Sequence, residues 1–269
     1  MSKKQRLNPP ALTKINLADY SPNHTENYDK SSARAEEEQL EERLSLLQER
    51  LYAENKQALL VVFQAMDAGG KDSGIKKVFL GVNPMGVKVA SFKQPSTLEL
   101  SHDFLWRVHR EVPPKGYIGI FNRSHYEDVL IARVNKLVPR KVWEQRYDHI
   151  NDFERLLVTS GTRVIKFFLH ISKEEQKERF EERLSNPEKH WKFSSADLEV
   201  RKLWDQYMKA YETAITRTNT DYAPWYIIPA NKKWYRDLVI TRILVETLEA
   251  MNPQFPPPEP NLDQIVIPD

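Results

Sequence analysis

The chain has 269 residues, no cysteine, and 40 basic against 38 acidic side chains, which gives a formal net charge of +2. This length suffices for one large α/β domain or two small ones, and the missing cysteine excludes disulfides, a thiolate nucleophile and cysteine-ligated metal centres. The start, MSKKQRLNPP, is charged and broken by proline, and the apolar runs are too short to span a bilayer, so we expect a soluble cytoplasmic protein with no membrane partner.

The two ends of the chain lack a regular pattern. Residues 1–30 contain prolines and no sustained period, which predicts an irregular N-terminal arm. The tail, residues 252–269, has six prolines and should be extended, on the surface or on a neighbour. Between them, we predict that residues 31–251 form a single domain.

The domain opens with a helical pattern from about residue 32 to 54. Its apolar face is formed by Leu40, Leu44, Leu47 and Leu51, which recur at spacings of four, three and four. We expect this face to pack on the domain's own core, and a subunit interface is the alternative. We also expect the protein to be a homo-oligomer.

Five short apolar runs, each followed by a helical pattern, predict a parallel sheet. The runs are 58–65, 86–92, 117–122, 163–171 and 225–230. Helical patterns are found at about 71–80, from Ser96 through SHDFLWRVHRE as one helix, and at 126–134, 140–160 and 233–251. Strands that alternate with helices imply an α/β fold whose sheet is covered on both faces.

The connection between the fourth and fifth predicted strands contains about 50 residues without a strand pattern. Ser172 and Glu175 predict a capping box at the start of one helix, which an Asn-Pro pair at 186–187 ends. A second helix should start at Ser194 or Ser195. We interpret this excursion, about residues 172–200, as a helical lid rather than a second domain.

The stretch VVFQAMDAGGKDSGIKK, residues 61–77, has the layout of a phosphate-binding loop. Two fixed positions of G-x-x-x-x-G-K-[ST] differ, because Ala65 replaces the first glycine and Asp72 replaces the hydroxyl residue. Backbone N–H groups can still bind a phosphate, and Lys71 can supply a point charge. Asp67 adds a carboxylate to the loop, and an acid beside a phosphate is costly unless a metal or a proton lies between them. The alternative is a glycine-rich turn with solvated lysines.

A second cluster, FNRSHYEDVL, follows the third predicted strand. Ligands of parallel sheets gather at the carboxyl ends of the strands, so this cluster should lie near the loop. Glu127 or Asp128 could hold magnesium, and Arg123 could clamp a phosphate. The alternative is a capped loop with a surface salt bridge.

The lid carries the third cluster. Arg179 and Arg183 are four residues apart and should share one helix face, with Lys189, His190 and Lys192 further on. Arginines on the inner face of a lid would close on transferring phosphates and exclude water. Alternatively, both arginines pair with neighbouring glutamates on a solvated face.

Seven separated blocks resemble polyphosphate kinase family 2, in order AMDAGGKDSGIKK, FKQPS, SHDFLWRVH, FNRSHYEDVL, HISKEEQKERFEERL, KHWKF and APWYIIPANKKWYRDL. The resemblance covers about residues 50–255 and implies a P-loop kinase-like three-layer fold with a five-stranded parallel sheet and a helical lid. It further implies reversible phosphoryl transfer between inorganic polyphosphate and nucleotides with Mg²⁺. The loop form D-x-x-G-K-[DG] is usual in this family. Asn122 and Glu127 depart from many members and resemble the class III subgroup, which accepts AMP and ADP.

The resemblance extends the roles assigned above to individual residues, with Asp128 as the metal-holding acid. The predicted catalytic residues are Asp67, Lys71, Arg123, Asp128, Arg179 and Arg183, and the predicted metal ligands are Asp67 and Asp128. The predicted nucleotide- and phosphate-binding residues are Ala68, Gly69, Gly70, Lys71, Asp72, Lys76, Lys77, Asn122, Arg123, Glu127, Arg133, Lys189 and Lys192. We expect inorganic polyphosphate and adenine nucleotides as substrates, with guanine nucleotides left open, and no nucleic acid as a partner.

Two other functions stay open at this point. An ATP-dependent nucleoside monophosphate kinase would have the same fold but would need a donor adenine site. A non-catalytic nucleotide- or RNA-binding protein would use the basic lid on a phosphate backbone and would bind in a salt-sensitive way. Intact Lys71 beside two acidic metal candidates argues against the second function.

Overall fold

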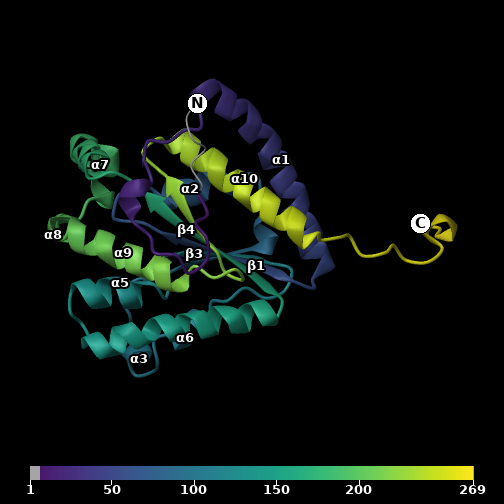
Figure 1. The fold of residues 1–269 in the computed structure, drawn as a ribbon. Helices are drawn as coiled ribbons and strands as arrows, with labels where there is room; N and C mark the ends of the chain where they lie inside the picture. Colours follow the sequence, from purple (N-terminus) through teal and green to yellow (C-terminus); the bar gives the residue numbers. More distant parts are fainter. Residues whose placement is uncertain (1–6, 269) are drawn as a thin grey trace.

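A central sheet organises the computed structural model, which describes residues 7–268 (Figure 1). Its strands are all parallel, in the order β2-β3-β1-β4-β5. They are β1 (Ala58–Gln64), β2 (Val87–Ser91), β3 (Ile118–Asn122), β4 (Thr162–His170) and β5 (Trp225–Pro229). Because β1 lies between β3 and β4, the loop that leaves β1 emerges beside the carboxyl ends of both neighbours.

Helices cover both faces of this sheet (Figure 1). One layer contains α1 (Lys30–Glu54), α2 (Lys71–Val78) and α10 (Lys233–Met251), and the other contains α5 (Glu127–Val134), α6 (Arg140–Thr159) and α9 (Trp204–Thr218). The lid region contains α7 (Lys173–Ser185), the 3₁₀ turn η3 (Pro187–Lys192) and α8 (Ser195–Lys202). The short elements are η1 (Leu17–Asp19), η2 (Pro84–Gly86), α3 (Thr97–Leu100), α4 (Trp106–His109) and η4 (Leu262–Gln264). The predicted three-layer α/β fold with a five-stranded parallel sheet is confirmed.

The core follows from the apolar pattern of the strands and of the helix faces. Every residue of β1 is buried, as expected for a parallel strand that is covered on both sides. Leu44, Leu47 and Leu51 of α1 are also buried, and α1 packs along α10 of the same chain. This face therefore belongs to the domain's own core, which is the first of the two interpretations of its pattern.

A helix begins after Ser96 as predicted, but the single continuous helix through SHDFLWRVHRE is wrong. The chain forms two single turns instead, α3 and α4. The Ser101 hydroxyl donates a hydrogen bond to the Leu98 carbonyl at 2.7 Å, and the Asp103 carboxylate accepts one from the Leu105 N–H at 2.9 Å. Short polar side chains that bond to nearby backbone groups stop a helix from continuing, so the SHD segment separates the two turns.

The lid also differs from its predicted pattern in two details. Ser172 accepts a hydrogen bond from the Glu175 N–H at 3.1 Å, but the Glu175 carboxylate bonds to Arg179 rather than completing a capping box. The second predicted helix is divided into α8 and α9, which meet at Leu203.

The ends of the chain behave differently from each other. The N-terminal arm is irregular, yet Ile15 and Leu17 are buried, and the Leu7 carbonyl accepts a hydrogen bond from Ile227 of β5 at 2.8 Å. The C-terminal tail leaves the body of the protein as an extended segment, and its Val266 and Ile267 are each 87% exposed (Figure 1). Among residues 7–268, no helix is long and apolar enough to cross a bilayer.

Candidate active site

The loop between β1 and α2 has the backbone of a phosphate-binding nest. Ala68 and Gly70 adopt left-handed conformations, with φ values of 58° and 95°. A Cβ atom on Gly69 would lie 2.5 Å from the Ala65 Cβ and 2.7 Å from the Met66 carbonyl oxygen, so only glycine fits there. Ala65 is tolerated in place of the usual glycine because Gly69 leaves room for its methyl group. Alternating left-handed residues turn N–H groups toward one concavity, which is how such loops bind anions.

Side chains from α7 and α10 hold the loop from behind. Gln176 donates a hydrogen bond to the Asp67 carbonyl at 2.8 Å, and Arg179 donates one to the Ala68 carbonyl at 2.9 Å. Arg236, which is buried, donates one to the Gly70 carbonyl at 3.1 Å. These carbonyl oxygens are therefore satisfied, and the loop is held in one orientation at its base.

Four charged groups meet where the loop approaches the end of β3. The Arg123 guanidinium lies 3.0 Å from the Asp67 carboxylate, and the buried Lys71 ammonium donates to the Ala65 carbonyl at 3.0 Å. Burial lowers the pKa of Lys71, and the Arg123 charge acts in the same direction. Burial raises the pKa of Glu127, although Arg123 and Lys71 oppose this shift. The cluster is thus a partly buried arrangement of cations and acids that opens to the surface at Arg123, and a phosphate would add a negative partner.

The unusual acid at position 72 has a structural partner. Asp72 accepts a hydrogen bond from the Asn122 side-chain amide at 2.5 Å, which joins the start of α2 to the end of β3. Arg123, the next residue, has a left-handed φ of 62°, and its N–H bonds to the Phe63 carbonyl at 3.1 Å. The ends of two neighbouring strands are therefore fixed to each other at the loop.

A cleft of about 470 Å³ opens in front of these groups. Its walls combine predicted residues with residues that our sequence reasoning missed. The predicted ones are Asp67, Ala68, Gly69, Gly70, Lys71, Asp72, Asn122, Arg123, Arg183 and Lys192, and the missed ones are Ser73, Ser91, Phe92, Lys93, Trp191, Ser194 and Asp197. Lys93 lies in the FKQPS block, so the resemblance contained a signal for it. Burial raises the pKa of Asp197, and the nearby Asp67 charge raises it further.

The Asp128 carboxylate pairs with two arginines rather than with the loop, and its metal role stays a prediction. Its carboxylate lies 3.3 Å from Arg146 and 3.8 Å from Arg107, and neither Asp128 nor the predicted binding residue Glu127 lines the cleft. Its neighbour Glu127 instead accepts a hydrogen bond from Gln64 at 3.3 Å. Successive residues at a helix start point about 100° apart, so only one of these two acids can face the loop.

Four predicted phosphate-binding cations lie outside the cleft walls. The Lys77 ammonium pairs with Glu41 and lies 3.5 Å from Glu37, both on α1. Arg133 lies over the ring of Trp143 at 4.8 Å, and Lys189 pairs with Glu182. Lys76 is exposed on α2. Lys77, Arg133 and Lys189 each contact another side chain instead, and for Lys77 that partner comes from a distant helix, α1.

The two lid arginines share a helix face but have different surroundings. Arg179 is 6% exposed and donates hydrogen bonds to Glu175 at 2.7 Å and to the Ala230 carbonyl at 2.6 Å, besides the loop. Arg183 lines the cleft, donates to the Lys192 carbonyl at 3.1 Å and lies 3.5 Å from Asp197. Arg179 thus pairs with a neighbouring glutamate, as the alternative predicted, but it does so in the interior rather than on a solvated face.

The donor set fits a magnesium ion that is shared with substrate. In the described part of the chain, no group of three or more His, Asp or Glu side chains is arranged to hold a metal ion. Magnesium is usually held by one or two carboxylates together with substrate phosphates and water. Asp67 meets this requirement, because its carboxylate lies in the phosphate loop and lines the cleft.

Comparison with known proteins agrees with this geometry. The family model described as polyphosphate kinase 2 (PPK2) matches residues 27–256. The AMP/ADP-polyphosphate phosphotransferase of Meiothermus ruber is 55% identical over 267 residues, which cover 98% of this chain and 99% of that protein. The ADP-polyphosphate phosphotransferase of Rhodopseudomonas palustris is 48% identical over 231 residues, 81% of this chain and 80% of that protein. The crystal structure of polyphosphate kinase 2 from Arthrobacter aurescens TC1 superposes with a TM-score of 0.92 at 40% identity, covering 96% of this chain and 93% of that one.

Proposed function

Because the chain belongs to the polyphosphate kinase 2 family, it is a polyphosphate-dependent nucleotide phosphotransferase, and we propose that it phosphorylates both AMP and ADP with Mg²⁺ as cofactor. The observation that carries the proposal is the match over almost its whole length to a protein named for both nucleotides. It favours this activity over an ATP-dependent nucleoside monophosphate kinase or a non-catalytic RNA-binding protein.

We assign roles in the transfer from the positions of the side chains. Backbone N–H groups of the loop and the Lys71 ammonium bind the phosphoryl group that moves, and Arg123 holds it from the end of β3. Arg183 and Lys192 of the lid, which line the same cleft, bind further phosphates of the donor chain. Asp67 holds the magnesium ion, which neutralises phosphate charge when bound. These groups act by positioning and by charge, which is what phosphoryl transfer requires.

The proposal is tested by incubating the purified protein with Mg²⁺, polyphosphate and AMP, and by following nucleotides by chromatography. We expect ADP first and ATP later, with no ATP added. A preparation of Lys71→Ala is the control for contaminating kinases. Phosphorylation of AMP only when ATP is the donor would instead identify a nucleoside monophosphate kinase. Binding of RNA without any transfer would identify a non-catalytic protein.

Three acids near the site should respond differently to magnesium. Asp67→Asn is expected to move the midpoint of a magnesium titration of activity upward by about tenfold, since about 1.4 kcal/mol of metal binding is lost. Glu127→Gln should lower kcat by about tenfold because the orientation of Lys71 and Arg123 depends on its charge. Asp128→Asn should leave the titration in place, since its carboxylate faces Arg146 and Arg107. If only Asp128→Asn shifted the midpoint of the magnesium titration, Asp128 rather than Asp67 would be the metal ligand.

The decrease in turnover at acidic pH should follow the protonation of Glu127. Its pKa is raised by burial, so the carboxylate is protonated at a higher pH than an exposed glutamate. Turnover by the wild type should therefore fall as the pH drops through this raised pKa. Glu127→Gln should have a lower plateau and lack this decrease. An identical decrease in both proteins would assign the titration to another group.

A further inference from the structure

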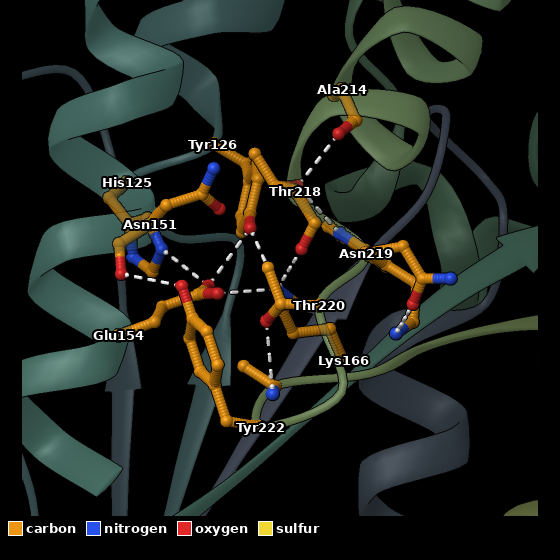
Figure 2. Close-up of polar contacts among 12 residues, drawn as sticks. His125, Tyr126, Asn151, Glu154, Lys166, Ala214, Thr218, Asn219, Thr220 and Tyr222 are labelled. Atoms are coloured by element: carbon orange, nitrogen blue, oxygen red, sulfur yellow. Dashed lines mark hydrogen bonds and ion pairs between the residues drawn. The ribbon is translucent and has the colours of Figure 1, made fainter. Parts of the chain in front are cut away.

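A network of buried polar groups lies behind the site, in the layer between the sheet and α6 (Figure 2). Lys166 of β4 and Glu154 of α6 are both fully buried and form an ion pair. The Lys166 ammonium also donates to the Tyr126 hydroxyl at 3.0 Å and to the Thr218 carbonyl at 2.8 Å. All three of its hydrogens therefore have acceptors.

The carboxylate of Glu154 bonds to two successive residues of one turn. One of its oxygens accepts a hydrogen bond from the Tyr126 hydroxyl at 2.9 Å and lies 3.3 Å from His125 Nε2. Ser124, just before them, accepts a bond from the Tyr126 N–H at 3.1 Å. Ser124, His125 and Tyr126 are fully buried. The Glu154 carboxylate therefore joins the segment between β3 and α5 to α6 by hydrogen bonds, and the His125 ring also packs against Phe153 of α6.

The same turn carries two groups of the proposed site. Arg123 directly precedes the buried segment, and Glu127 directly follows it. Arg123 is also held at a positive φ, a conformation that persists only when surrounding contacts enforce it. The turn thus has an outer pair of residues that face the phosphate loop and an inner pair that face Glu154.

Stability alone does not explain such a network. Removing a carboxylate and an ammonium from water costs several kcal/mol each, and apolar residues of the same volume often replace a buried pair without loss. However, a carboxylate at position 154 can accept hydrogen bonds from His125 and Tyr126, which an apolar side chain cannot do.

We propose that Glu154 is a positioning residue for phosphoryl transfer, which fixes the β3–α5 turn through His125 and Tyr126 and so sets where Arg123 and Glu127 stand. Lys166 holds the carboxylate in place by neutralising it. The expected effect on turnover rests on the proposed function. The expected effect on the order of the β3–α5 turn does not depend on any substrate.

The test compares Glu154→Gln with the double variant Glu154→Leu/Lys166→Met, which removes both charges together. The double variant should still fold and should melt at a higher temperature than Glu154→Gln, because it leaves no buried charge unpaired, although the Tyr126 hydroxyl and His125 lose their acceptor. Its kcat should nevertheless fall by about ten- to a hundredfold with little change in the KM values, because the turn is displaced rather than a binding group removed. Glu144→Gln, the same chemical change in a surface pair of α6 with Arg140, is the matched control and should behave like the wild type.

A second measurement separates this inference from the proposed activity. Hydrogen–deuterium exchange of residues 122–127 should be faster in the double variant, while β1 and α10 stay protected. An inert wild type with this local change would contradict the proposed function and the kinetic role of Glu154, while it would support the claim that Glu154 fixes the turn. A double variant with wild-type kcat and unchanged exchange would show that the network serves stability alone and would overturn it. If the double variant does not fold, Tyr126→Phe is the variant to measure, because it removes the hydrogen bond from Tyr126 to Glu154 and leaves the contact of His125 in place. A Tyr126→Phe protein with the kcat and the hydrogen exchange of the wild type would overturn the proposal.

Discussion

Lys71→Ala should lower kcat by about two to three powers of ten, which is the usual effect of losing one positioned group that stabilises the transition state. The ammonium stands at the end of the phosphate loop, where it meets the phosphoryl group that moves. Lys77→Ala, six residues later in α2, is the matched control and should keep near wild-type turnover, because that lysine pairs with α1. Near wild-type turnover by Lys71→Ala would show that the loop does not bind the transferred group.

Lys71 also leads to an expectation about stability. Burial lowers its pKa, which means that the charged form lacks full compensation while no phosphate is present. Lys71→Met keeps most of the volume without the charge, so it should melt at the wild-type temperature or higher in the absence of substrate. Polyphosphate should then stabilise the wild type much more than Lys71→Met. A lower melting temperature for substrate-free Lys71→Met would mean that the bond to the Ala65 carbonyl is itself a major stabilising contact.

The second large effect separates the two lid arginines. Arg179→Met should destabilise the protein by about 3 kcal/mol, because it leaves the carbonyls of Ala68 and Ala230 without their donor in the interior. Its turnover should fall as well, since the phosphate loop loses one of its supports. Urea unfolding measures the first effect and steady-state kinetics the second.

Arg183→Met is the matched substitution one helical turn later. It should unfold near the wild-type urea concentration and raise the KM for polyphosphate by about tenfold, with AMP affected less. The increase should shrink at high salt, where binding of the polyanion by the wild type is itself screened. If both variants showed only a raised KM for polyphosphate, Arg179 would belong to the donor channel rather than to the support of the loop.

The sequence predicted the sheet and its order of elements because these depend on local patterns. Each strand is a short apolar run, and the last helix, 233–251, begins and ends where its pattern does. The loop was recognisable because glycines and a lysine stand between a strand and a helix. These features need no knowledge of what lies across the fold.

The side-chain partners could not be predicted in the same way. Lys77 was expected at a phosphate, and Glu41, far away in sequence, holds it instead. Arg236 supports the phosphate loop from α10, and nothing near position 236 in the sequence indicates this contact. The choice between Glu127 and Asp128 depends on where α5 begins, and one residue of uncertainty there exchanges the acid that faces the loop.

The attachment of α7 to the phosphate loop determines which part of the lid can move. Rotating α7 away would break the buried bonds from Gln176 and Arg179 to the loop carbonyls. Arg201 at the end of α8 donates to the Lys173 carbonyl at 2.6 Å, which secures the other end of the excursion. Between these points, the contacts of Lys189 and Arg183 lie at the surface or at the cleft and are weaker. We therefore expect only about residues 186–200 of the lid to move when a long polymer enters, while α7 stays attached to the phosphate loop.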